Sequence, residues 1–158
     1  MKRSILVFGI ATMMLAGTAL AQGARNLPPR PTLTGPVADL VNQIVNAINK
    51  QDRAFVEKIV GPNATWADED GHIFPATFFI NKLMQGMPRK LTPTTPISGE
   101  TWDNAAWAAF DYTLDETLAN GSSNRIKGTQ TLTFRKMGND WQVVLIHGAI
   151  DAKAVTPH

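Results

Sequence analysis

Residues 125–150 read RIKGTQTLTFRKMGNDWQVVLIHGAI, which is two strand-like runs joined by a turn. In the first run polar and apolar side chains alternate, as in a strand with one covered face. Gly138, Asn139 and Asp140 then supply the residues of a hairpin turn. The second run starts at Trp141 and is apolar on both faces, which is typical of a central strand. The sequence therefore predicts an antiparallel hairpin inside a larger sheet.

The chain before this hairpin is also strand-like. Four runs in all are predicted strands: residues 94–102, 106–118, 125–136 and 141–150. Asn120 and Gly121 give a second hairpin signal between two of them. Asp111 and Tyr112 are adjacent in the chain, so they must point to opposite faces of their strand. The Tyr112 face is the more apolar one, and we expect it to face the interior.

An amphipathic helix is predicted from Val37 to Lys50. Its apolar residues have the i, i+3, i+4, i+7 spacing of one helical face, and they are Val37, Leu40, Val41, Ile44, Val45 and Ile48. Asp52 is a suitable N-cap for a second, shorter helix, which Gly61 and Pro62 would end. The apolar residues of this second helix are Phe55, Val56, Ile59 and Val60.

A short strand and a third helix complete the predicted order. Residues 64–69 form the strand, and Asp70 and Gly71 close it as a turn. Pro75 begins a helix that residues 86–88 end with a glycine and a proline. The side chains expected to face inward are Phe79, Ile80, Leu83, Met84 and Met87. The predicted class is therefore α+β, in the order α-α-β-α-β-β-β-β.

The N-terminal residues 1–21 have the features of a secretion signal. Lys2 and Arg3 precede an apolar stretch, and a small-x-small cleavage pattern ends at Ala21. The stretch is too short and too weakly apolar to serve as a stable membrane anchor. We expect cleavage near Ala21 and a secreted or periplasmic protein.

The remaining chain is predicted to hold one domain, residues 37–152, between two flanking segments. Residues 22–36 contain four prolines and form either a linker or an extended arm laid on the domain surface. Residues 153–158 form a short C-terminal tail. A domain of this size is large enough for one hydrophobic core.

Charge and composition exclude several classes of function. The chain has 15 Lys and Arg against 13 Asp and Glu, but two of the cations belong to the predicted signal. The remaining charges balance, so the sequence predicts no nucleic-acid partner. There is no cysteine, so disulfides and thiolate metal sites are excluded. Residues 68–72 lack the spacing of a calcium loop, and we predict neither a metal nor a cofactor.

The order of elements resembles the nuclear transport factor 2-like superfamily, in particular its SnoaL-like and ketosteroid-isomerase-like bacterial members. The matching features are the Val-x-x-Leu-Val-x-x-Ile-Val-x-x-Ile helix from Val37, Asn49-Lys50-Gln51-Asp52, the Trp66-x-Asp68-x-Asp70-Gly71 strand end, and the hairpin of residues 132–144. The resemblance covers residues 37–150. It implies a curved antiparallel sheet wrapped around the N-terminal helices as a cone, with a pocket at its open end. It also implies a homodimer formed through the outer face of the sheet.

Two residues are candidates for acid–base chemistry. Asp68 shares a strand face with Trp66, and the ketosteroid isomerases that the chain resembles use a pocket carboxylate as a base. His147 shares a strand face with Val143 and should be at least partly buried. A solvated strand-end acid and a core histidine are the plainer interpretations. The isomerases that the chain resembles also use a tyrosine to stabilise the oxyanion. Tyr112 is the single tyrosine of this chain, and the first helix has none, which argues against isomerase chemistry.

The predicted pocket lining is Trp66, Trp102, Tyr112 and Gln130. The leading interpretation is a protein that binds a small molecule, either apolar or of mixed polarity. One alternative is an isomerase or hydrolase that uses Asp68 or His147. A second alternative is a non-catalytic dimerisation or assembly module, whose interior would be filled by its own side chains.

Overall fold

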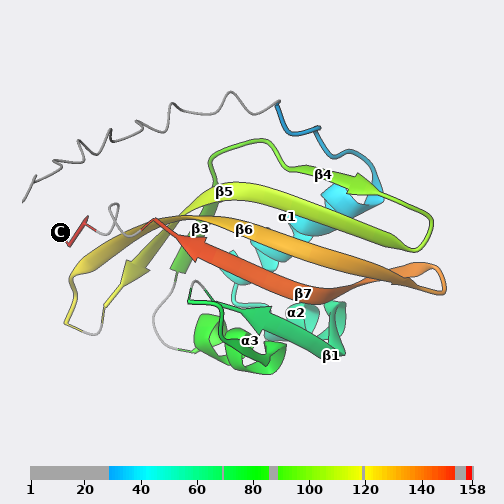
Figure 1. Ribbon diagram of the computed structural model, residues 1–158. Helices are drawn as coiled ribbons and strands as arrows, with labels where there is room; N and C mark the ends of the chain where they lie inside the picture. The colour runs from blue at the N-terminus through cyan, green and yellow to red at the C-terminus, as the bar shows by residue number, and fades with distance from the viewer. Residues whose placement is uncertain (1–28, 69, 86–88, 119, 152–155, 158) are drawn as a thin grey trace, which may run out of the picture.

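A computed structural model describes residues 29–68, 70–85, 89–118, 120–151 and 156–157 (Figure 1). Its elements are α1 (Pro36–Asn49), α2 (Arg53–Ile59), β1 (Val60–Ala67), β2 (Ile73–Pro75), α3 (Ala76–Met84), β3 (Arg89–Pro93), β4 (Ser98–Thr101), β5 (Ala105–Thr117), β6 (Ser123–Met137), β7 (Asp140–Ile150) and β8 (Thr156–Pro157). The predicted signal, the start of the arm, Met87 with the predicted end of the third helix, and most of the C-terminal tail lie outside the described residues.

The three predicted helices are present, and local sequence explains where they begin. The proline at the start of α1 suits a first helical turn, because its missing N–H would have no partner there. The side chain of Asp52 accepts a hydrogen bond from the backbone N–H of Phe55 and so caps α2, as predicted. Pro75 is the N-cap of α3. No helix among the described residues is long and apolar enough to cross a membrane.

The strands form one eight-stranded, mostly antiparallel sheet. Its main path runs β2-β1-β7-β6-β5-β3, with β4 paired to β5 and β8 paired to β6. Both predicted hairpin turns are present, with Gly121 and Gly138 at positive φ. The predicted order lacked β2, β3 and β8. β2 and β8 have only three and two residues, and β3, which reads RKLTP, contains one aliphatic residue and shows no apolar alternation.

The first strand corrects two predictions. β1 begins at Val60, so Gly61 and Pro62 lie inside a strand and do not merely end α2. β1 also pairs parallel to β7, whereas the sheet was predicted to be antiparallel. The register of this pair shifts between Val60 and Thr65, an irregularity that accommodates the proline within the strand.

The predicted strand of residues 94–102 is also corrected, because only Ser98–Thr101 belongs to a strand. Residues 89–93 form β3 on one end of β5, and β4 pairs with the other end. The described end of the proline-rich arm runs beside β4, where the N–H of Gly99 donates to the carbonyl of Pro31 at 3.0 Å. Leu33 of this arm is buried in the core.

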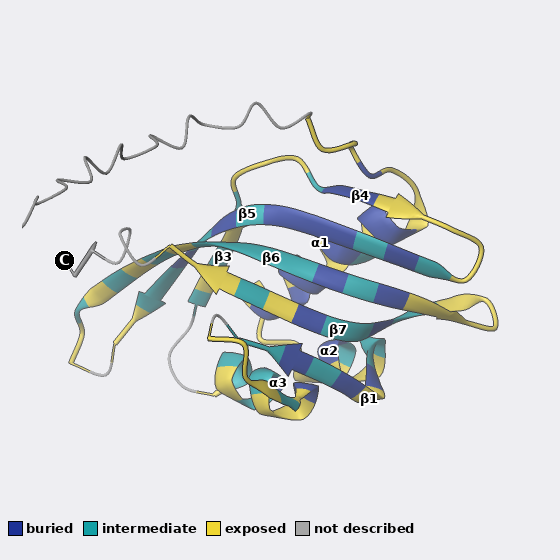
Figure 2. Ribbon diagram, in the orientation of Figure 1, coloured by how far each residue is buried: buried dark blue, intermediate teal, exposed yellow. Residues whose placement is uncertain are grey.

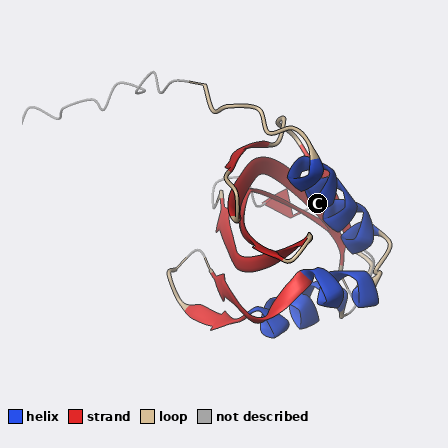
Figure 3. Ribbon diagram, turned by 90° about the vertical axis from the view of Figure 1, so that its right-hand side faces the viewer, coloured by secondary structure: helices blue, strands red, loops and turns tan. Residues whose placement is uncertain are grey.

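The core lies between the helices and the inner face of the sheet. Figure 3 shows the sheet curling strongly, with the helices along its open side. Figure 2 shows buried residues concentrated along β5 and on α1 behind it. On β5, Phe110, Tyr112 and Leu114 are buried, while Asp111 and Thr113 are half-exposed. The predicted inward orientation of Tyr112 is therefore confirmed.

Candidate functional site

A cavity of about 150 Å³ lies between the helices and the inner face of the sheet. Its lining is mostly aliphatic and aromatic, and comes from all three helices and from β1, β3, β5, β6 and β7. The α1 side chains in it are Val41, Ile44, Val45 and Ile48. A cavity of about 150 Å³ lined by apolar side chains is large enough for a molecule of roughly the size of benzene. The amphipathic stripe that predicted α1 thus supplies one wall of the cavity.

Tyr112 lies over a glycine on the neighbouring strand. Tyr112 and Gly128 are paired across β5 and β6, and a Cβ at Gly128 would come within 2.9 Å of the Tyr112 hydroxyl. It would also collide with the carbonyl oxygen of Ala149. The absence of a side chain at residue 128 therefore leaves room for the hydroxyl end of the tyrosine over β6.

Gln130 is the polar residue in the deeper part of the cavity wall. It is paired with Phe110 across β5 and β6. Its Nε2 donates to the carbonyl oxygen of His147 at 2.7 Å. No buried side-chain nitrogen or oxygen in the described part of the chain lacks a hydrogen-bond partner. No buried polar side-chain atom of the deep wall therefore requires a hydrogen bond from a ligand.

Charged side chains line one part of the cavity. Arg89 and Glu116 are paired across β3 and β5, and the Arg89 Nε lies 2.9 Å from a carboxylate oxygen of Glu116. Arg89 Nη1 also donates to the backbone carbonyl of Lys82 at 2.6 Å. The Lys82 ammonium lies 5.4 Å from the centroid of the Trp66 ring. These three charged side chains belong to the lining but were not predicted.

Trp66, Tyr112 and Gln130 line the cavity, as predicted. Trp66 is buried among aromatic rings, with Phe79 and Phe74 at centroid distances of 5.3 Å and 5.4 Å. Asp68, Trp102 and His147 are not part of the lining. The structure therefore separates both acid–base candidates from the cavity.

The predicted burial of His147 is wrong, because β7 contains a bulge. Thr133 of β6 pairs with Leu145 and Phe134 pairs with Val143, so Val144 is an extra residue in β7. Beyond the bulge the alternation is inverted, and Ile146 is buried while His147 is exposed. The His147 side chain therefore lies on the outer face of the sheet.

The predicted pocket position of Trp102 is also wrong. β4 ends at Thr101, and the N–H of Trp102 donates to the carbonyl of Ala105 in the turn that leads into β5. Its side chain is 51% exposed. Trp102 follows the last residue of β4, so the strand alternation that predicted an inward-facing side chain does not extend to it.

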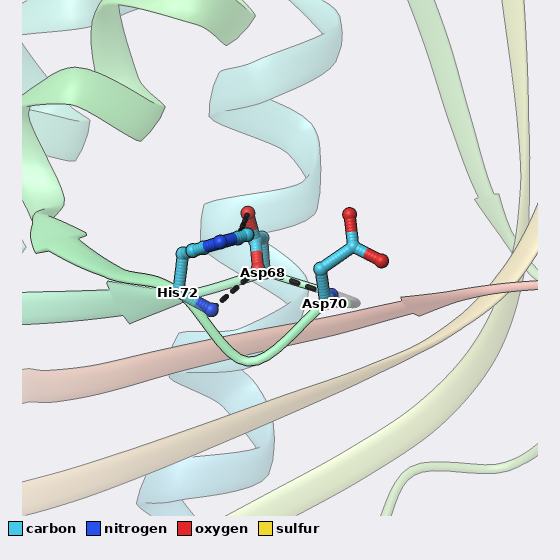
Figure 4. A group of neighbouring side chains, drawn as sticks. All are labelled: Asp68, Asp70 and His72. Carbon is cyan, nitrogen blue, oxygen red and sulfur yellow. Dashed lines mark hydrogen bonds and ion pairs between the residues drawn. The ribbon is translucent and has the colours of Figure 1, made fainter.

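Asp68 closes the turn between β1 and β2. One of its carboxylate oxygens accepts from the backbone N–H groups of His72, at 2.8 Å, and Asp70, at 3.1 Å. Its other oxygen lies 3.3 Å from the His72 Nδ1. Figure 4 shows the His72 ring against Asp68, and no hydrogen bond or ion pair is drawn from the Asp70 carboxylate to either side chain. The carboxylate thus accepts its hydrogen bonds from within its own turn.

The same contacts set the ionisation of Asp68, whose side chain is 15% exposed. Desolvation raises the pKa of this carboxyl group, but the two backbone N–H groups and the His72 ring outweigh it. The pKa of Asp68 is therefore lowered. One ligand-type atom from each of Asp68, Asp70 and His72 lies within 4.8 Å of the others, but the turn's own hydrogen bonds account for the arrangement.

The architecture is similar to that of several solved structures. A nuclear transport factor 2-like superfamily protein from Salmonella enterica subsp. enterica serovar Typhimurium str. LT2 has 20% identity and a TM-score of 0.65, covering 73% of this chain and 89% of its own. Hexachlorocyclohexane dehydrochlorinase LinA-type3 from Novosphingobium barchaimii LL02 has 15% identity and a TM-score of 0.64, covering 77% and 87%. The association domain of C. elegans CaMKII has 14% identity and a TM-score of 0.60, covering 72% and 92%.

No protein-family model matches the sequence, and no curated protein matches it significantly. The similarity to solved structures at low identity establishes the fold but not the function. The chain has the nuclear transport factor 2-like fold, an α+β architecture, and the predicted fold class is confirmed.

Proposed function

We propose that this protein binds a small, largely apolar molecule in the cavity between its helices and its sheet. The observation that supports this proposal most strongly is the cavity itself, with its wall of aliphatic and aromatic side chains. Burial of a ligand's apolar surface against such a wall is favourable by roughly 25 cal/mol per Å². A wall whose buried polar atoms are already hydrogen-bonded also suits an apolar ligand body.

Binding is better supported than acid–base catalysis by Asp68 or His147. Asp68 makes hydrogen bonds within its own turn, and His147 lies on the outer face of the sheet. Proteins of this fold include one named as a hexachlorocyclohexane dehydrochlorinase, whose named substrate is a small apolar molecule. They also include an association domain. The presence of the cavity supports ligand binding over the alternative of an assembly module, whose interior would be filled by its own side chains.

The proposed setting of this activity is outside the cytoplasm, because residues 1–21 have the features of a cleaved secretion signal. A homodimer through the outer face of the sheet stays a prediction. A small-molecule binder also needs a cavity that a ligand can enter. The lining includes the exposed residue Lys82 and the partly exposed residues Arg89 and Glu116, so the cavity reaches the protein surface there.

Toluene is a suitable neutral probe for the proposed function, because the cavity has room for a single small ring. We expect toluene to raise the melting temperature by a few degrees at about ten times its Kd. Ile126→Phe should fill part of the cavity and abolish this rise, since Ile126 lines it and is half-buried. Ile97→Phe is the matched control, because Ile97 is half-buried but outside the lining.

The proposal fails if toluene stabilises neither the wild-type protein nor the Ile97→Phe variant. It fails equally if Ile126→Phe is stabilised as much as wild type, because the probe would then bind elsewhere. A complementary approach is native mass spectrometry of protein purified from its own host, in which a retained small molecule would identify the natural ligand.

A further inference from the structure

The cavity has two chemically different ends. Phe110 and Glu116 both face inward on β5 and both line the cavity. They are six residues apart, which corresponds to roughly 20 Å along an extended strand. Phe110 is fully buried, and its neighbours in the lining include Leu132 and Val143. At the other end Arg89 is paired with Glu116, and its guanidinium contacts the backbone of the third charged lining residue, Lys82.

The charged end carries one more cation than it carries anions. Arg89 and Glu116 form an ion pair whose side chains are 22% and 16% exposed. Lys82 adds a second cation to the lining, and its ammonium makes no ion pair with any acid among the described residues. The described lining holds no other Asp or Glu side chain. This end of the cavity therefore favours a negative charge over a positive one.

The cations are held in place by neighbouring groups. Arg89 is fixed by Glu116 and by the carbonyl of Lys82, through two of the five N–H groups of a guanidinium. The Lys82 ammonium lies over the face of Trp66, which itself is buried in the cavity wall. A ligand carboxylate that reached this end would meet a cation whose side chain is already held, so binding avoids part of the cost of ordering a free side chain.

We propose that the ligand of this cavity is a small amphiphile: an apolar body against the aliphatic and aromatic wall and a single carboxylate toward Lys82 and Arg89. This inference rests on the proposed function and names the chemical class of its ligand. A carboxylate fits because the planar guanidinium and the ammonium both donate to its oxygens. A cationic head group would meet two like charges and one acid that is already paired.

The test compares two probes that differ only in the head group, 4-bromobenzoate and 4-bromobenzyl alcohol. Isothermal titration calorimetry at neutral pH and low salt measures the Kd of each for the full chain. We expect the carboxylate to bind about fivefold more tightly than the alcohol, a modest ratio because the charged end is partly open to water. Added salt should reduce the ratio toward one.

Three variants locate the charge that makes the difference. Lys82→Gln should bring the two Kd values together, and Lys82→Arg should preserve the preference. Lys90→Gln is the matched control, because it removes the same charge from an exposed neighbour of Arg89 that does not line the cavity. This variant should retain the fivefold preference.

Equal affinities of wild type for the two probes would overturn the inference and leave the proposed function in place. A preference that Lys82→Gln and Lys90→Gln reduce equally would also overturn it, because the effect would then come from the general charge of this surface. If neither probe binds and toluene also fails to bind, the proposed function itself is wrong.

Discussion

The cavity and the turn between β1 and β2 both contain charged side chains, and these side chains make different contacts in the two places. In the turn, the Asp68 carboxylate accepts two backbone N–H groups and contacts the His72 ring. In the cavity, Arg89 and Lys82 face a mostly apolar space. A polar residue close to turn residues is therefore a weak indication of a site, because the backbone competes for its oxygens.

The largest expected effect is a difference in stability between a variant of the cavity wall and a variant of the surface near the turn. Phe110→Ala should lower the free energy of unfolding by about 3–5 kcal/mol, because it removes a fully buried ring beside an existing cavity. Phe78→Ala is the matched control, since Phe78 is 53% exposed. It should cost roughly 1 kcal/mol or less through its ring contacts. Urea unfolding measures both, and equal losses would contradict the assigned core.

A second effect tests the close approach of Tyr112 to β6. Gly128→Ala should cost about 1–3 kcal/mol, because the new methyl group collides with the carbonyl of Ala149 and displaces the tyrosine. At Gly148 the nearest atom to an added Cβ is the Gln130 Oε1 at 3.9 Å. Gly148→Ala should therefore be nearly neutral. Similar unfolding curves for the two variants would show that Tyr112 is not packed as described.

The turn is tested by the pH dependence of Asp68→Asn. The pKa of Asp68 is lowered in the folded protein, so its charged form stabilises the fold above the unfolded pKa. That stabilisation is lost as pH falls through the folded pKa. Asp68→Asn should therefore melt below wild type at neutral pH, with a difference that shrinks in acid. Asp70→Asn is the control, and a pH-independent difference between Asp68→Asn and wild type would contradict the turn's role.

The smallest expected effect concerns His147. His147→Ala should change the free energy of unfolding by no more than about 0.5 kcal/mol, because the side chain is exposed on the outer face. Toluene binding should stay unchanged, since the hydrogen bond from Gln130 goes to the His147 backbone carbonyl. Thermal-shift titration of this variant beside wild type checks both points, and lost toluene binding would restore His147 to the site.

Sequence periodicity predicts the elements well where one face is apolar and the other polar. The stripe from Val37 to Ile48 predicts α1, and the alternation around Tyr112 predicts which face of β5 is buried. In β7 both faces are apolar, so the alternation carries no information on parity. The bulge at Val144 is marked by neither glycine nor proline, and His147 was therefore assigned to the wrong face.

The charged end of the cavity depends on tertiary structure that local patterns do not contain. Arg89 reaches Glu116 only because β3 pairs with β5, and the sequence of β3, RKLTP, shows no apolar alternation that would predict a strand. Lys82 lies in the predicted third helix, but its position over Trp66 depends on the packing of α3 against β1. The ion pair of Arg89 and Glu116 would have been recognisable only after that strand pairing was known.

The central claim is that the cavity between α1 and the sheet is the ligand site of this protein. A crystal structure with 4-bromobenzoate tests it most directly, because the anomalous signal of bromine locates the ring independently of the protein density. We predict bromine inside the cavity, against its aliphatic and aromatic wall, and the carboxylate toward Lys82 and Arg89. Bromine at the turn of Asp68 or on the outer face of the sheet, with the cavity empty at a saturating concentration, would contradict the claim.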